Sequence, residues 1–128
     1  MICGIGTDLV EIKRIEASIG TYGDRFIRRI FTEDEQLAAK QRSTIARFYA
    51  MRFAAKEAAW KALSPGRSSG VRWIDLEVRS APDGKPEMVF HGAAREIFHQ
   101  KAGLAGQVDL SLSDDGGMAL AFVVLSKP

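Results

Sequence analysis

The segment Arg52–Leu63, RFAAKEAAWKAL, is the second half of a stretch that predicts one long helix from about Thr44 to Leu63. Apolar residues recur at helical spacing along one face, and alanines fill much of the remaining surface. The apolar face consists of Ile45, Phe48, Tyr49, Phe53, Ala59, Trp60 and Leu63, and the remaining alanines are Ala46, Ala50, Ala54, Ala58 and Ala62. A helix that is apolar nearly all round is typical of a protein interior. Ser64-Pro65-Gly66 ends it, because the residue before a proline disfavours the helical conformation.

Two acidic residues stand where apolar sequence is expected. Glu57 lies inside this helix, between Lys56 and Lys61, and Asp8 lies in the run Met1–Val10 (MICGIGTDLV), which predicts a buried strand. Burying an uncompensated carboxylate costs several kcal/mol or more, so each residue needs a cation, a metal ion or several hydrogen-bond donors. Magnesium is usually held by one or two carboxylates together with substrate phosphates. The two residues therefore suggest a site for a divalent metal and a phosphate.

A simpler interpretation stays open at this level. Glu57 and Lys61 are four residues apart, and such a helical ion pair contributes about 0.3–0.5 kcal/mol. Asp8 would then only cap the helix that follows it. The residue types alone do not decide between an ion pair with a cap and a metal site.

The rest of the chain predicts an α+β fold, with a small, mainly antiparallel sheet packed against the long helix and shorter helices around it. Gly4 and Gly6 would let another backbone or a ligand approach the first strand. Thr32 and Glu35 have the spacing of a capping box that begins a helix running to about Arg42. The other expected elements are a helix from Ile12, a short amphipathic segment Arg25–Phe31, a hairpin of Val71–Arg79 and Lys85–His91 around Pro82-Asp83-Gly84, a helix Ala93–Ala102, and a closing hairpin of Gln107–Ser113 and Met118–Leu125 around Asp114–Gly117.

Composition narrows the classes of protein. With 128 residues, 46% of them hydrophobic and 27% charged, the chain is expected to form a single domain, residues 1–128. The single cysteine, Cys3, cannot form an internal disulfide, and no stretch approaches the ~18 apolar residues of a membrane span, so a cytoplasmic protein with no membrane partner is expected. Dinucleotide, Walker, zinc and nucleophile-elbow patterns are lacking, as is the basic–aromatic alternation of single-strand nucleic-acid binders. His91 and His99 have no partner at metal-ligand spacing and are expected to be structural.

Two segments of the chain carry a resemblance to a known family. Gly4–Ile12 (GIGTDLVEI) and Arg52–Leu63 closely resemble the two signature motifs of holo-[acyl-carrier-protein] synthases, the short, single-domain class of 4′-phosphopantetheinyl transferases. The resemblance extends to Arg29–Glu33, Trp73–Val78, Gly84–Pro86 and the closing hairpin, and is weakest around Gly92–Gly106.

The resemblance implies an activity and roles for particular residues. The enzyme would transfer the 4′-phosphopantetheine group of coenzyme A to a serine of apo acyl carrier protein, in fatty acid biosynthesis, and release adenosine 3′,5′-bisphosphate. Asp8 and Glu57 would bind magnesium and, with Lys61 on the phosphates, form the catalytic group. Lys56, Lys85 and Pro86 would lie near coenzyme A. Glu57 or a water on the metal would accept the serine proton, and the protein would form a homotrimer with its sites between subunits.

One departure from the family leaves a second function open. Many relatives have Ser-His at the start of the last turn and a tyrosine on the final strand, whereas this chain has Ser113-Asp114 and Met118. An aspartate would repel a phosphate there, so Asp114 would point away, take a helper cation, or close the turn. A non-catalytic module that binds coenzyme A or carrier protein is therefore the alternative.

A basic patch is the expected contact with the carrier protein. Acyl carrier proteins are acidic, so their docking surface should combine positive charge with an apolar anchor. Arg14, Arg25, Phe26 and Arg29 supply this combination, with Arg28 beside them. Arg14 and Arg29 also match positions where relatives bind the carrier helix that follows the serine.

Overall fold

The computed structural model describes residues 1–128 and has the expected α+β architecture. The elements in chain order are β1 (Ile2–Glu11), α1 (Ile12–Tyr22), α2 (Asp24–Ile30), α3 (Glu33–Ala39), α4 (Ile45–Leu63), a 3-10 helix (Trp73–Asp75), β2 (Leu76–Ser80), β3 (Pro86–Phe90), α5 (Gly92–Ala102), β4 (Gln107–Asp115) and β5 (Met118–Ser126). None of the helices combines the length and apolar composition of a membrane span.

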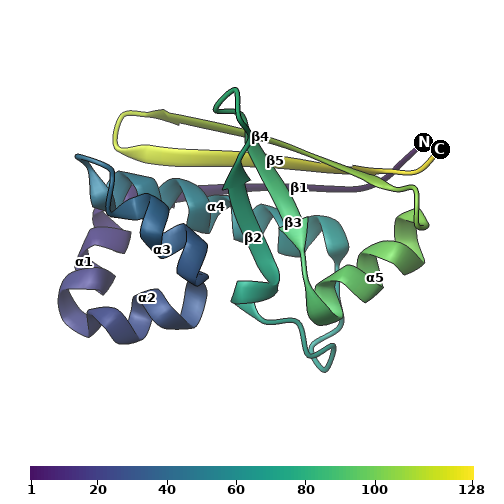
Figure 1. The fold of residues 1–128 in the computed structure, drawn as a ribbon, viewed down its shortest axis with the longest axis horizontal. Helices are drawn as coiled ribbons and strands as arrows, with labels where there is room; N and C mark the ends of the chain where they lie inside the picture. Colours follow the sequence, from purple (N-terminus) through teal and green to yellow (C-terminus); the bar gives the residue numbers. More distant parts are fainter.

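The first strand pairs with the last. β1, β5 and β4 form a three-stranded antiparallel sheet in that order, with Asp8 opposite Ala121 and Leu9 opposite Leu120. The backbone amide of Lys127 donates to the carbonyl of Met1 (2.8 Å), so the two ends of the chain lie side by side (Figure 1). This pairing joins a motif near the N-terminus to the closing hairpin.

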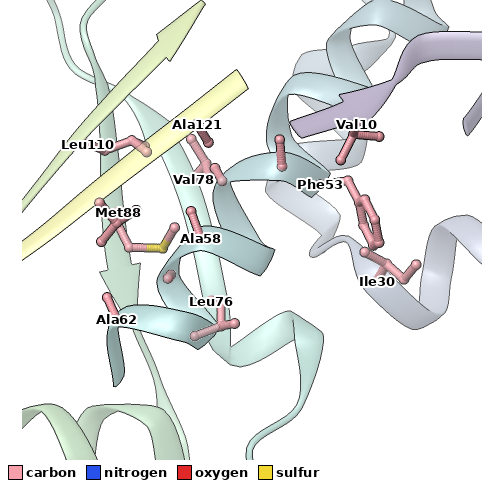
Figure 2. Close-up of a cluster of buried hydrophobic side chains, with 14 of the residues drawn as sticks. Val10, Ile30, Phe53, Ala58, Ala62, Leu76, Val78, Met88, Leu110 and Ala121 are labelled. Carbon is pink, nitrogen blue, oxygen red and sulfur yellow. The ribbon is translucent and has the colours of Figure 1, made fainter. Parts of the chain in front are cut away.

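Helix α4 lies against the inner face of this sheet, and glycines in β1 let the two backbones come close. A β-carbon at Gly6 would overlap the backbone oxygen of Ala58 and lie 2.8 Å from the amide nitrogen of Ala62. On the helix side, Ala58 and Ala62 are the small residues that face the strands (Figure 2). The expectation that another backbone approaches this strand is confirmed.

The other side of α4 is covered by the β2–β3 hairpin and α5, while α1, α2 and α3 gather at the N-terminal end of α4 (Figure 1). Leu76 and Val78 of β2 and Met88 of β3 point into the core around α4 (Figure 2). The helix is thus enclosed between a three-stranded and a two-stranded sheet, as its nearly uniform apolar surface predicts.

A buried ion pair connects three elements inside this core. Lys56 Nζ donates to Glu35 Oε1 (2.8 Å) and to the carbonyls of Trp73 (3.1 Å) and Leu76 (2.6 Å), and both charged side chains are fully buried. Glu35 also accepts from the backbone amides of Thr32 and Val78. The predicted capping box at Thr32 is confirmed, and its glutamate also links α3 to α4 and β2.

Three predicted elements differ from the structure. Val71–Asp75 is not strand, because the Asp75 carboxylate accepts from the Arg72 amide (3.0 Å) and stabilises a 3-10 turn before β2 begins. The helix that begins after Thr32 ends at Ala39 rather than near Arg42. The turn of the last hairpin is only Gly116-Gly117, with φ of 57° and 78°, so Asp114 belongs to β4 and does not close the turn.

Replacing Gly6 by alanine tests the close approach of β1 to α4. We expect Gly6→Ala to lower the free energy of unfolding by about 1–3 kcal/mol, because the new methyl group meets rigid backbone rather than a flexible side chain. Urea unfolding followed by circular dichroism measures this. Gly20→Ala is the matched control, since nothing lies within 4 Å of a β-carbon there, and it should leave stability unchanged or slightly raised. Equal stability of the two variants would contradict this account of the packing.

Candidate active site

Strand alternation places Asp8 on the inner face of β1, together with Gly6 and Val10, whereas Leu9 points outward. Its side chain is only 10% exposed. Oδ1 accepts from Lys61 Nζ at 3.1 Å, but Oδ2 is buried and has no hydrogen-bond partner. A buried carboxylate oxygen without a donor is costly. Asp8 therefore presents an open position for a cation.

Glu57 is half-buried on α4 and faces the same spot. Its pKa is raised above the ordinary value, first by burial and then by the negative charge of Asp8, while Lys61 and Arg14 act in the opposite direction. Two carboxyl groups that raise a pKa in this way repel each other when both are ionised. A divalent cation between them would remove that repulsion.

Lys61 completes the group. Its ammonium donates to the Asp8 carboxylate and to the carbonyl of Thr7 (2.9 Å), and its side chain is 54% exposed. Lys61 thus pairs with Asp8 across elements, not with Glu57 along the helix. Asp8 is no helix cap either, because Glu11 holds the N-cap position of α1 and makes no side-chain cap bond. The simpler interpretation of these residues is therefore wrong.

The chemistry of the pair fits magnesium. No group of three or more His, Cys, Asp or Glu side chains lies at metal-binding distance. Two carboxylates are nevertheless enough for magnesium, which keeps several waters and takes phosphate oxygens from a substrate. Asp8 and Glu57 are the residues that would hold such an ion.

A cavity of about 590 Å³ opens beside Glu57 and Lys61. Half of its lining residues are charged, Glu57 and Lys61 among them, and the other half are apolar. The lining residues are Arg29, Glu57, Trp60, Lys61, Val71, Arg72, Trp73 and Ile74. A molecule with both a charged and an uncharged part would suit this cavity.

The predicted basic patch borders this group. Arg25, Phe26 and Arg29 of α2 line a second cavity, of about 420 Å³, and Arg29 also lines the cavity beside Glu57. Arg14 is exposed on α1 and close enough to Glu57 to lower its pKa. The patch and the carboxyl pair are therefore neighbours.

The remaining predicted contacts lie elsewhere. Lys56 is fully buried, and its three hydrogen bonds to Glu35, Trp73 and Leu76 leave no donor for a bound molecule. Lys85 and Pro86 line a separate cavity of about 270 Å³ that shares no residue with the one beside Glu57. Within one chain, neither Lys56 nor the Lys85-Pro86 turn joins the carboxyl pair.

Asp114 pairs with a nearby cationic side chain, which is the second of the three alternatives given above for this residue. Arg47 on α4 donates to it through Nε (2.9 Å) and Nη2 (2.6 Å). The arginine lowers the pKa of Asp114, so this carboxylate stays ionised and paired. The pair attaches the end of β4 to α4 and offsets the negative charge that would repel a phosphate.

Sequence reasoning overlooked two features of this region. Trp60 was expected on the apolar face of the helix and Trp73 in a strand, yet both are partly exposed and line the cavity beside Glu57. The spacing of Glu57 and Trp60, three residues apart on one helix, is a signal that points to a shared face. Arg47 carried no comparable signal, because its partner lies 67 residues away.

Comparison with known proteins identifies the family. Residues 4–118 match the model of the 4′-phosphopantetheinyl transferase superfamily. A holo-[acyl-carrier-protein] synthase of Methylorubrum extorquens (strain PA1) is 46% identical over 127 residues, which cover 98% of this chain and 93% of that protein. The chain belongs to the holo-[acyl-carrier-protein] synthases.

Solved structures of synthases share the fold. The crystal structure of the Neisseria meningitidis holo-[acyl-carrier-protein] synthase has a TM-score of 0.88 and 38% identity, and the alignment covers 99% of this chain and 100% of that one. A synthase of Bacillus anthracis in complex with CoA (3′,5′-ADP) has a TM-score of 0.79 and 37% identity, covering 100% and 99%. The resemblance seen in the signature motifs is confirmed for the family and for the fold.

Because Asp8 lies beside Glu57, a change of charge at Asp8 should alter the pKa of Glu57. We expect Asp8→Asn to lower the pKa of Glu57, because it removes the like charge, while burial continues to act in the raising direction. Carbon-detected NMR titration of the Glu57 carboxyl group measures the change. In the native protein, Glu57 keeps its proton to a higher pH than in the unfolded chain, so its ionisation reduces stability as the pH rises above 4.5. Asp34→Asn, at an exposed position of α3, is the control, and an unchanged Glu57 pKa in Asp8→Asn would contradict the contact.

Proposed function

We propose that this protein transfers the 4′-phosphopantetheine group of coenzyme A to a serine of apo acyl carrier protein, in the cytoplasm, as part of fatty acid biosynthesis. The observation that carries the proposal is the Asp8–Glu57 carboxyl pair with Lys61 bonded to it, in a chain whose relatives are holo-[acyl-carrier-protein] synthases. A relative crystallised with CoA supports coenzyme A as the donor. We propose that residues 1–128 act as a single domain.

A divalent cation, magnesium, is proposed at Asp8 and Glu57. The buried, unpartnered Oδ2 of Asp8 and the raised pKa of Glu57 both support a positive charge between the two side chains. When bound, magnesium would neutralise the diphosphate of coenzyme A and stabilise the leaving bisphosphate. Phosphoryl transfer depends mainly on such positioning and charge neutralisation.

The protein residues then divide the remaining work. The serine oxygen bonds to the phosphorus that carries the pantetheine, the bond from that phosphorus to the bridging oxygen breaks, and the bridging oxygen leaves with adenosine 3′,5′-bisphosphate. Lys61, with its exposed ammonium, contacts the phosphate oxygens. Glu57 is a candidate acceptor for the serine proton, because its carboxylate lines the cavity beside the phosphates and lies within reach of a serine held there.

The carrier protein is proposed to dock on the basic patch of Arg14, Arg25, Phe26 and Arg29. The exposed arginines complement an acidic partner, and the cavity beside Phe26 can receive an apolar side chain. Arg29 reaches from this cavity to the one beside Glu57, so a carrier bound there would hold its serine close to the carboxyl pair.

A homotrimer with sites between subunits is proposed as the assembly. The outer face of the β1–β5–β4 sheet exposes a row of large apolar side chains, namely Ile5, Leu9, Leu120 and Phe122. Exposed apolar sheet surface of this kind is typical of a subunit interface. Lys85 and Pro86 lie apart from Glu57 within one chain, so we propose that they reach the coenzyme A bound to a neighbouring subunit.

A transfer assay tests the function. Incubation with coenzyme A, apo carrier protein and magnesium should add one phosphopantetheine to the carrier, as measured by intact-protein mass spectrometry. Asp8→Ala and Glu57→Ala should each reduce the rate at least about 100-fold, while Asp34→Ala, at an exposed position of α3, should retain it. Binding of coenzyme A without transfer under any divalent ion would favour the non-catalytic binding module instead.

Charge reversal on the patch tests the docking surface. We expect Arg14→Glu and Arg25→Glu to raise the KM for carrier protein about tenfold and to leave the KM for coenzyme A unchanged, because they repel the acidic partner alone. Steady-state kinetics with each substrate varied in turn measures this. Lys13→Glu, an exposed neighbour of Arg14 outside the patch, is the matched control. An unchanged carrier KM in both arginine variants would remove the assignment.

A further inference from the structure

The apolar wall of the cavity beside Glu57 has no role in the chemistry described so far. It is built around Trp60 and Trp73, whose ring centroids lie 6.0 Å apart at an interplanar angle of 37°. Phe53, which is buried, packs against Trp73 at 5.6 Å and holds it from the core side. Both tryptophans are partly exposed, so their free surfaces face the cavity.

The position of this wall is set by helix geometry and by the buried ion pair. Trp60 lies three residues after Glu57 on α4, so the two side chains share a helix face. Trp73 precedes β2, and its carbonyl accepts a hydrogen bond from buried Lys56. The two tryptophans therefore form an apolar wall beside Glu57.

We propose that the Trp60–Trp73 wall binds the pantetheine arm of coenzyme A, an inference that rests on the proposed transferase function. The arm is long and uncharged, and it begins at the phosphorus that the serine attacks. A cavity of about 590 Å³ that is lined both by Glu57 and Lys61 and by two tryptophan rings matches a molecule that changes from a charged diphosphate to an uncharged chain at that point.

Arg29, which the two cavities share, favours the arm over the adenosine. Arg29 lines this cavity and also belongs to the basic patch proposed for the carrier protein. The serine must reach the phosphorus that carries the arm, so the carrier side of the diphosphate is also the arm side. Trp60 and Trp73 thus act as specificity-determining residues for the arm, and adenine stacking on them is the competing outcome.

Binding measurements with two ligands separate these outcomes. Calorimetry in the presence of magnesium measures the affinity for each ligand. We expect Trp60→Ala to weaken the binding of coenzyme A at least about tenfold and to change the affinity for adenosine 3′,5′-bisphosphate by no more than about twofold. Trp60→Phe, which keeps an aromatic face, should retain most of the coenzyme A affinity. An equal loss for both ligands would assign the wall to adenine, and an unchanged coenzyme A affinity with a raised carrier KM would assign it to the carrier; each result overturns the proposal.

Fluorescence of the unmodified protein gives a second test that needs no variant. The chain has only two tryptophans, Trp60 and Trp73, so its tryptophan emission reports on this wall alone. We expect 4′-phosphopantetheine to shift that emission and adenosine 3′,5′-bisphosphate to leave it unchanged, and the reverse pattern would overturn the proposal. A protein that binds neither coenzyme A nor the bisphosphate would fail the proposed function itself, whereas one that binds both without the expected difference would fail only the arm assignment.

Discussion

The close contact between β1 and α4 is the constraint on which the rest of the structure depends. Gly4 and Gly6 leave no side chain between the strand and the backbone of α4. Asp8 follows Gly6 by two positions and therefore lies on the same face of the strand. Because the strand and the helix are so close, Asp8 comes against Glu57 and Lys61. A larger residue in the strand would separate the two carboxylates and remove the site without touching either one.

Two neighbouring residues of α4 have opposite roles because consecutive side chains on a helix point about 100° apart. Lys56 points into the core, where Glu35 and two backbone carbonyls satisfy all of its donors. Glu57 points toward Asp8 and the cavity. The buried lysine still serves the site indirectly, since its bond to the Trp73 carbonyl fixes the segment that forms the cavity wall. Lys56 therefore stabilises the fold, and Glu57 has the binding role that we propose.

The electrostatics of the site are unfavourable in the protein alone, which is typical of a site prepared for a charged ligand. Burial and the negative charge of Asp8 raise the pKa of Glu57, and Lys61 and Arg14 offset only part of this effect. Arg47 and Asp114 show the contrasting case, in which a bidentate pair satisfies both charges and leaves none for a ligand. The site that we propose contains a buried carboxylate oxygen without a partner, Asp8 Oδ2, whereas the carboxylates of Glu35 and Asp114 are paired and join elements.

Local patterns in the sequence determined much of the fold: α4 from its apolar repeat, its end from Ser64-Pro65, the capping box from Thr32 and Glu35, and the family from two motifs. These features depend on residues within a few positions of one another. Only the tertiary structure decided that Lys56 is buried, that Lys61 pairs with Asp8, that Arg47 pairs with Asp114, and that Trp60 and Trp73 line a cavity. Each of these contacts joins elements far apart in the chain, and the distance between such elements is set by packing, which spacing along the sequence does not encode.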